Sequence, residues 1–209
     1  MNVMITAHSG CDDLAMNSEE YILHALTLGV DALEVDVRRS SEGALILTHN
    51  PPEPGQVYIT LRETFSLVRD SAVKVNCDLK ERGLERNVLD LAETCGVERE
   101  RIIFTGTLTD WREKLEGCNV WVNPEEICAD YYAGKHDPEK MMALAADYGY
   151  SVINMDYNFM DERVIETAQA HGLKLSVWTI DEPHEIIHSL RIINITTNYP
   201  SRIFTALQA

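Results

Sequence analysis

Short runs of apolar and β-branched residues alternate along the chain with longer segments in which apolar residues recur every three or four positions. Runs of the first kind predict buried strands, and segments of the second kind predict amphipathic helices. Asp or Ser precedes several of the helical segments and Gly follows several, as is typical of helix caps. The pattern predicts strands at 3–7, 32–38, 73–80, 101–106, 119–123, 151–156, 173–179 and 193–197, and helices at 19–29, 63–70, 85–96, 110–117, 137–149, 161–172, 182–190 and 201–208.

This alternation gives eight strand-then-helix units, which indicates an α/β protein with a parallel sheet. An extra apolar run at 43–49 follows the second strand through the turn-rich sequence SSEG, and we interpret it as an excursion of the second unit. Eight units within 209 residues predict a single domain, residues 1–209, folded as a closed (β/α)8 TIM barrel. An open doubly wound sheet is the competing architecture.

Charge separates this chain from an average globular sequence. It carries 18 basic and 34 acidic residues, a net charge of −16. Nucleic acids and anionic membrane surfaces both bind basic patches, so neither is expected as a general partner. An anionic substrate would need a metal ion or a local basic cluster. No apolar run approaches the roughly 20 residues that cross a bilayer, so stable membrane insertion is not expected, and the oligomeric state stays open.

The cysteines and the first residues both bear on the expected location. The opening MNVMITAHSG lacks the basic and apolar regions of a signal peptide. Five cysteines without a CxxC pair indicate free thiols in a reducing compartment, so we expect a cytoplasmic protein. Cys11 and Cys77 flank the candidate site described next, where small buried thiols that serve packing are the simpler interpretation.

Polar residues gather at the ends of the expected strands, where TIM barrels carry their chemistry. Three carboxylates at one barrel mouth would repel each other without a cation, and oxygen ligands suit Mg²⁺ or Ca²⁺. Two histidines beside that cation suit a general base and a general acid acting on a phosphate ester, and a lysine adds positive charge for a phosphoryl oxygen. The residues are His8, Glu34, Asp36, His49, Asp78 and Lys80, with Trp178 at the end of the seventh strand.

An ordered set of motifs resembles the glycerophosphodiester phosphodiesterase family. AHSG stands where the family has His-Arg-Gly, and EVDVRRSSEG followed by THN matches its Glu-x-Asp, Asp-Gly turn and His-Asp. ITLRETFSLV is similar to its Pro-Thr-Leu-x-Glu segment, and CDLK to its Glu-x-Lys. VWTI and ITTNYP resemble its Trp-Thr-Val-Asn and Thr-Asp-x-Pro. The resemblance covers nearly the whole chain.

The resemblance implies a PLC-like phosphodiesterase barrel that splits a glycerophosphodiester, a small-molecule substrate, into glycerol 3-phosphate and an alcohol. It implies one divalent cation, Mg²⁺ or Ca²⁺. Carried over by position, His8 and His49 become the catalytic acid–base pair, Glu34, Asp36 and Asp78 the metal ligands, Lys80 a phosphate-binding residue, and Trp178 a contact to the alcohol.

The chain departs from the family pattern at several of these positions. Ser9 replaces the family's Arg, Met16 replaces its Glu, Asn50 replaces the Asp after the second His, and Asp78 shortens the third ligand. Arg38 is a candidate substitute for the lost cation, or a solvated arginine leading into a turn.

Residues 50–59 leave no room for the family's usual insertion, so the substrate contacts are thinned. Two alternatives therefore stay open: a catalytically retired barrel that binds a phosphorylated ligand or a protein, and a phospholipase of the sphingomyelinase D type. A sugar-phosphate isomerase or aldolase would need a lone catalytic Lys or a Gly-rich phosphate loop late in the chain, and TIDEPHE and TNYPSR supply neither.

Overall fold

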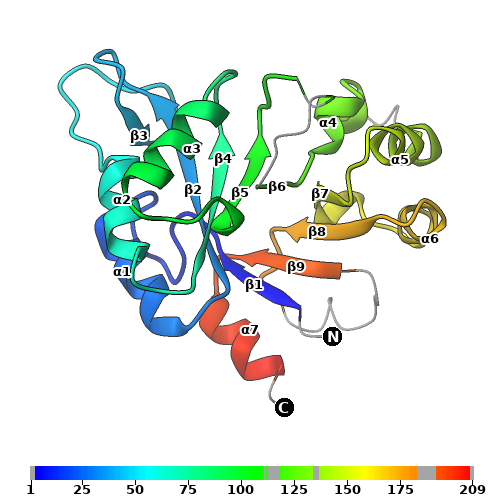
Figure 1. Cartoon of the computed structure of the whole chain (residues 1–209). Coiled ribbons are helices and arrows are strands. Elements are labelled where there is room, and N and C mark those ends of the chain that lie inside the picture. Colours follow the sequence, from blue (N-terminus) through cyan, green and yellow to red (C-terminus); the bar gives the residue numbers. More distant parts are fainter. Residues whose placement is uncertain (1–2, 111, 113–117, 134–136, 183–191, 208–209) are drawn as a thin grey trace.

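Parallel strands lie side by side at the centre of the molecule, and helices cover them from outside (Figure 1). The computed structural model describes residues 3–110, 112, 118–133, 137–182 and 192–207. The parallel strands are β1 (Met4–Ala7), β2 (Ala32–Arg39), β4 (Lys74–Leu79), β5 (Ile102–Gly106), β6 (Asn119–Val120), β7 (Val152–Asp156), β8 (Lys174–Trp178) and β9 (Ile192–Thr197).

The order of these strands is that of a barrel. Neighbours follow β6-β5-β4-β2-β1-β9-β8-β7, so only β6 and β7 need to meet for closure. They meet through a parallel bridge between Val122 and Ile153, where the Val122 N–H donates to Val152 O at 3.3 Å and Asn154 N–H donates to Val122 O at 3.0 Å. The eight-stranded (β/α)8 barrel expected from the sequence is confirmed, nearly closed.

The helices follow the strands in the predicted order. Ser18 caps α1 through a 3.1 Å bond from the Tyr21 N–H, and the helix ends at Gly29 in the left-handed conformation. Most residues of the two helices expected at 110–117 and 182–190 lie outside the described residues. The described helices are α1 (Glu19–Leu28), α2 (Leu61–Val68), α3 (Glu85–Thr94), α4 (Pro124–Ile127), α5 (Pro138–Asp147), α6 (Glu162–Ala170) and α7 (Pro200–Leu207), with 3-10 turns at Arg99–Arg101, Tyr131–Ala133 and Tyr157–Phe159.

The excursion after β2 is a hairpin. β3 (Leu45–Leu47) pairs antiparallel with β2 after a turn at Gly43, which has a φ of 88°. The chain then returns along β2, and the Thr48 N–H donates to Asp36 O at 2.9 Å. The hairpin therefore brings the next residue, His49, back to the same end of β2 that carries its two acids.

A buried tyrosine ties the helix layer to this end of the barrel. Tyr21 on α1 is fully buried, and its hydroxyl lies 2.9 Å from both Ala7 O and Glu34 O. A buried hydroxyl needs such partners, because leaving it unpaired costs about 1–3 kcal/mol. The contact fixes α1 against the ends of β1 and β2.

Among the described residues, no helix combines the length and apolar character needed to cross a bilayer.

Candidate active site

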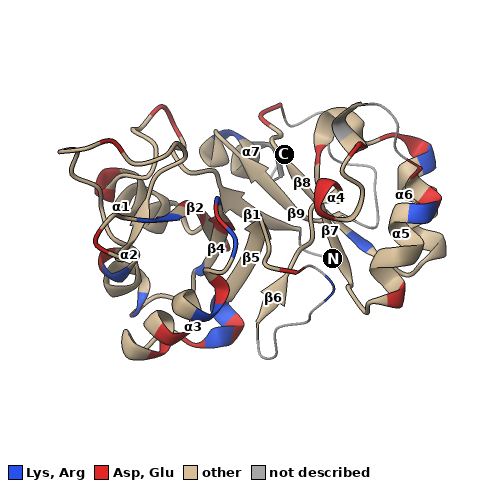
Figure 2. Ribbon diagram, turned by 90° about the horizontal axis from the view of Figure 1, so that it is seen from above, with Lys and Arg blue, Asp and Glu red and all other residues tan. Residues whose placement is uncertain are grey.

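A cavity of about 350 Å³ opens at the carboxyl ends of the strands. Figure 2 shows acidic segments in red beside basic segments in blue where β2 and β4 end. The cavity collects side chains from five strands (β2, β4, β5, β7 and β8), from α4 and from the loops between these elements, so the whole barrel forms it and no single motif does. Its lining residues are His8, Met16, Glu34, Asp36, His49, Asp78, Leu79, Lys80, Thr105, Gly106, Thr107, Asn123, Glu125, Glu126, Asn154 and Trp178.

Three carboxylates face one another across two neighbouring strands. Asp36 on β2 is the register partner of Asp78 on β4, and Glu34 lies two residues before Asp36 on the same face. One ligand oxygen from each of the three lies within 4.8 Å of the others. Glu34 and Asp36 are 8% and 2% exposed. The three carboxylates therefore form a compact and largely buried set of oxygen donors, which are the ligands that a hard divalent cation prefers.

Lys80 joins two of these acids. Its Nζ lies 2.9 Å from Asp36 Oδ1 and 2.6 Å from Asp78 Oδ2. Burial by itself would lower the pKa of Lys80, but the two adjacent carboxylates outweigh it and raise the pKa above its usual value. Lys80 is therefore a permanent cation. Among the described residues that line the cavity, it is the one Lys or Arg.

The three acids differ in the strength with which they hold a proton. Burial raises the pKa of Glu34 well above its ordinary value, and the charges of Asp78 and Asp36 add to this effect. Burial likewise raises the pKa of Asp78, although Lys80 offsets part of the shift. For Asp36 the balance is reversed, since Lys80 and a hydrogen bond from Asn17 outweigh burial and lower its pKa. A divalent cation would have to displace protons mainly from Glu34.

Two histidines line the cavity at different depths. His8 follows β1, and its backbone N–H donates to the backbone carbonyl oxygen of Thr197 at 2.9 Å. The ring Nε2 of His8 lies 3.6 Å from Glu34 Oε1. Burial lowers the pKa of His8, with Asp36 and the other nearby acids opposing the shift. His49 is exposed at the end of the hairpin, and its Nδ1 lies 3.3 Å from Asn50 Oδ1. The structure thus brings both predicted histidines to the cavity that holds the three acids.

The predicted substrate-binding residues divide into two groups. Lys80 and Trp178 line the cavity, and the buried Nε1 of Trp178 has no hydrogen-bond acceptor among the described residues. Arg38 is not among the described residues that line it. Its Nε donates to His49 O at 3.1 Å, and its Nη1 lies 3.5 Å from Glu81 Oε1. Arg38 therefore supports the segment that carries His49.

The two positions that depart most from the family pattern also differ in placement. Ser9 is fully buried, and its hydroxyl has no hydrogen-bond partner within the described chain. Met16 lines the cavity and is 52% exposed. Neither replaces the lost polar contacts, so the cavity offers a phosphate fewer charged groups than the family pattern implies.

Two side-chain amides contact the acids directly, and the sequence analysis did not identify either of them. Asn17 Nδ2 donates to Asp36 Oδ2 at 2.7 Å, and Asn76 Nδ2 donates to Glu34 Oε2 at 3.1 Å. Thr105 Oγ1 on β5 donates to Asn76 Oδ1 at 3.1 Å. No spacing rule connects Asn17, a loop residue, with Asp36 on β2.

A second group of missed residues comes from α4. Glu125 and Glu126 line the cavity, and Asn123 Nδ2 donates to Glu125 Oε1 at 2.9 Å. The Arg82 guanidinium lies 3.2 Å from Glu126 Oε2. A helix of four residues is too short to show the periodicity by which helices are found in a sequence.

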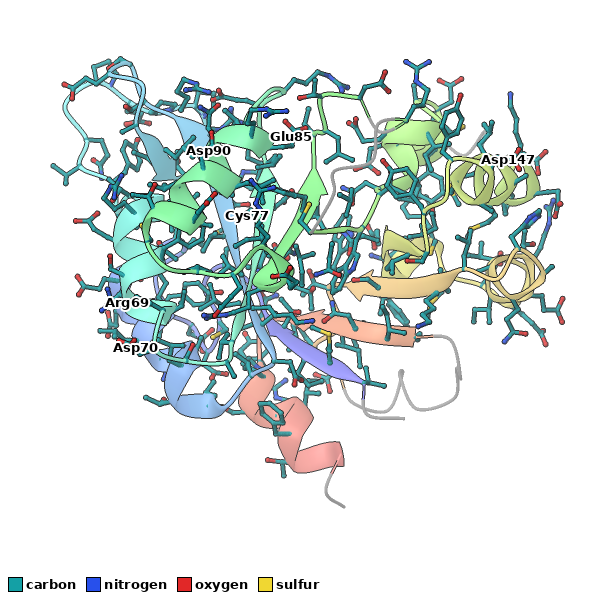
Figure 3. All side chains as sticks on the ribbon, viewed as in Figure 1. Arg69, Asp70, Cys77, Glu85, Asp90 and Asp147 are labelled. Carbon is teal, nitrogen blue, oxygen red and sulfur yellow. The ribbon has the colours of Figure 1, made fainter. Side chains whose placement is uncertain are left out.

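The neighbouring cysteines serve packing, as expected. Cys11 and Cys77 are fully buried in the hydrophobic core. Figure 3 shows Cys77 in the region of β4 and α3. Cys77 directly precedes Asp78 on β4, so the two side chains point to opposite faces of the strand. Burial raises the pKa of Cys11 to about 12, with the charge of Asp12 contributing, so this thiol stays protonated.

The chain is similar in sequence to proteins named glycerophosphodiester phosphodiesterase. No family model matches the sequence. A glycerophosphodiester phosphodiesterase of Caldanaerobacter subterraneus is 21% identical over 100% of this chain and 99% of its own length. Glycerophosphodiester phosphodiesterase GDPD4 of Arabidopsis thaliana is 22% identical over 95% of this chain and 71% of its own length. The chain is a distant relative of the glycerophosphodiester phosphodiesterases.

Solved structures of this family share the fold. The glycerophosphodiester phosphodiesterase of Thermotoga maritima superposes with a TM-score of 0.79 at 21% identity, covering 99% of both chains. A phosphodiesterase of Oleispira antarctica, solved with the product sn-glycerol-3-phosphate, has a TM-score of 0.74 at 14% identity and covers 99% of this chain and 97% of its own. The likeness to family structures extends over nearly the full length of the described barrel.

Proposed function

We propose that the protein is a metal-dependent phosphodiesterase that hydrolyses a glycerophosphodiester to glycerol 3-phosphate and an alcohol. The observation that carries this proposal is one cavity lined by three clustered carboxylates, two histidines and a lysine. The names of the two sequence relatives support the substrate class. The product bound in the Oleispira structure supports it independently.

The donor set fits a hard divalent cation. Glu34, Asp36 and Asp78 would hold it, since their oxygens lie within 4.8 Å of one another and carboxylates are the ligands that Mg²⁺ and Ca²⁺ favour. When bound, such a cation neutralises the charge that develops on a phosphoryl oxygen. Lys80, placed after the end of β4 beside two of the acids, would donate to another oxygen of the same phosphate.

The two histidines would move the protons. Because burial lowers the pKa of His8, this imidazole is neutral near pH 7 and accepts the proton of the neighbouring glycerol hydroxyl. The freed oxygen bonds to phosphorus, the bond to the alcohol oxygen breaks, and His49 protonates the departing alcohol. The product of this step is a cyclic phosphate of glycerol.

The second step reverses the roles. His49 takes a proton from water, whose oxygen bonds to phosphorus while the ring bond to the glycerol oxygen breaks. His8 returns its proton to that oxygen, which yields glycerol 3-phosphate. Trp178, at the end of β8, would pack against the alcohol portion of the substrate through its ring.

Hydrolysis of an aryl phosphodiester and of glycerophosphocholine tests the proposal, each with Mg²⁺, with Ca²⁺ and with EDTA. We expect turnover that needs metal and that falls by about 10²–10⁴-fold in His8→Ala and in His49→Ala. His171→Ala is the matched control, because this imidazole is paired with Glu139 at 2.8 Å, outside the cavity.

Two results would contradict the proposal in different ways. Tight metal binding without turnover of either diester would favour a catalytically retired barrel. Turnover that is unaffected by EDTA and by both histidine substitutions would place the activity outside this cavity.

A further inference from the structure

We infer that Asn17 is a positioning residue, one that fixes the Asp36 carboxylate so that Oδ1 alone is offered to the cation. The inference rests on the proposed metal-dependent function and adds a residue outside the predicted ligand set. Three observations support it: two hydrogen bonds between Asn17 and Asp36, the left-handed backbone of Asn17, and the different partners of the two carboxylate oxygens of Asp36.

The side chain of Asn17 makes two hydrogen bonds to Asp36. Asn17 Nδ2 donates to Asp36 Oδ2 at 2.7 Å, and the Asp36 N–H donates to Asn17 Oδ1 at 2.9 Å. Both polar atoms of the amide are used on one residue, once on its side chain and once on its backbone. Rotation of the Asp36 carboxylate would break the first of these bonds, so the orientation of this carboxylate is fixed.

The hydrogen bond from Asn17 Nδ2 gives the two carboxylate oxygens of Asp36 different partners. Oδ2 accepts from Asn17, whereas Oδ1 lies 2.9 Å from Lys80 Nζ, which also contacts Asp78 at 2.6 Å. Oδ1 is therefore the oxygen on the side of the other acid. A neutral amide on Oδ2 also stabilises the ionised carboxylate without adding a positive charge that would repel a cation.

The loop that carries Asn17 is built tightly around this contact. Asn17 is 8% exposed, its φ is 55°, and its backbone N–H donates to the backbone carbonyl oxygen of Ser9 at 2.6 Å. A Cβ on Gly10 would lie 2.9 Å from Leu14 O and from the Cα of Met16, so this loop closes on itself without spare space. Left-handed backbone outside glycine is a local cost that often accompanies functional positions.

Helix capping does not account for the side chain. The next residue, Ser18, caps α1 with its own hydroxyl. The amide of Asn17 makes its described hydrogen bonds to Asp36, which lies 19 positions further along the chain. Its side chain therefore acts on a candidate ligand and leaves the cap to its neighbour.

The test separates the side chain of Asn17 from its backbone. Asn17→Gly removes the amide but favours a φ of 55°, whereas Asn17→Ala removes it and strains the backbone. The dissociation constants of Mg²⁺ and Ca²⁺ are measured by titration calorimetry, with the melting temperature in EDTA as a fold readout. Asp13→Gly is the control, since it places glycine at an exposed left-handed position of the same loop, with a φ of 65°.

We expect Asn17→Gly to weaken metal binding by about 10–100-fold, the usual effect of losing a residue that orients a metal ligand, while Asp13→Gly binds as the wild type does. Wild-type affinity in Asn17→Gly would overturn the inference, as would an equal loss in Asp13→Gly. If Asn17→Ala fails to fold, Asn17→Gly still decides. A wild-type protein that binds neither ion would refute the proposed function, and the inference with it.

Discussion

Lys80 Nζ lies 2.9 Å from Asp36 Oδ1, so an ammonium from the end of β4 is paired with a carboxylate of the neighbouring parallel strand β2. The same ammonium contacts Asp78, and Glu34 completes the group of acids. With every group ionised, three negative charges and one positive charge leave a net −2 at the cavity floor. That excess matches one divalent cation, and the ammonium of Lys80 reduces the repulsion between the acids that it contacts.

Replacing Lys80 by Met should therefore cost stability. The two acids would lose their shared cation in a site where Asp36 has a 3% exposed side chain, and breaking a buried pair costs on the order of 3 kcal/mol. We expect urea unfolding in EDTA to show this loss and saturating Mg²⁺ or Ca²⁺ to restore part of it. Lys174→Met on β8 is the control, because Lys174 is exposed. Equal losses in both variants would refute the role given to Lys80.

Gly106 at the end of β5 should tolerate no side chain. Its φ is 76°, and a Cβ there would overlap Asp78 Oδ1 and the carbonyl oxygen of Leu79. Gly106→Ala should both lose about 1–3 kcal/mol or more in unfolding free energy and displace the Asp78 carboxylate, which weakens metal binding. Gly43→Ala has a similar φ of 88° with open space around it, so it carries the backbone cost alone. Calorimetric metal titration of both variants makes the comparison, and equal affinities would contradict it.

The sequence was sufficient for the barrel and for the acids on its strands. Side chains alternate along a strand, so Glu34 and Asp36 had to share a face, and parallel strands bring their carboxyl ends to one mouth. The hairpin at 43–49 was predicted as an excursion, and its antiparallel pairing with β2 explains why His49 returns to the acids.

What the sequence could not give is the loop geometry that surrounds these strands. Asn17 reaches Asp36 because a loop with left-handed residues folds back over β2, and no periodic pattern encodes such closure. Asn76 faces the barrel interior, but only the register places it beside Glu34. α4 (Pro124–Ile127) lies between the predicted strand at 119–123 and the predicted helix at 137–149, and no helix is predicted there because four residues carry no helical repeat.

Arg38 should act on His49 and not on phosphate. Its guanidinium contacts His49 O and Glu81, so Arg38→Gln would loosen the hairpin end that presents the imidazole. We expect a lower kcat, with inhibition by glycerol 3-phosphate close to that of the wild type. Lys80→Gln is the comparison, since loss of a phosphate contact should weaken that inhibition about tenfold or more. Weaker inhibition in Arg38→Gln would show that Arg38 binds the phosphate after all.

Metal-free stability should fall as the pH rises above the ordinary pKa of Glu34, 4.5. Burial raises the pKa of Glu34 in the folded protein, so between the unfolded and folded values the folded state binds more protons than the unfolded state. The unfolding free energy therefore decreases with pH across this window and becomes constant above the folded pKa. Asp36, whose pKa is lowered, acts in the opposite direction, but only below its ordinary value of 3.8.

A divalent cation reverses this trend, because it binds the ionised acids and competes with the proton on Glu34. Ca²⁺ or Mg²⁺ should raise the melting temperature more at about pH 8 than at about pH 5, where the proton competes. Glu34→Gln, which keeps the shape without the charge, should reduce the metal-free fall in stability and be more stable than the wild type at neutral pH. A smaller fall should remain, because burial also raises the pKa of Asp78. Calorimetric melting of both proteins with Ca²⁺, with Mg²⁺ and with EDTA at these two pH values decides. A pH dependence of the same size in Glu34→Gln as in the wild type would assign it to Asp78 or another group, and Glu34 would then be ionised in the folded protein without a metal.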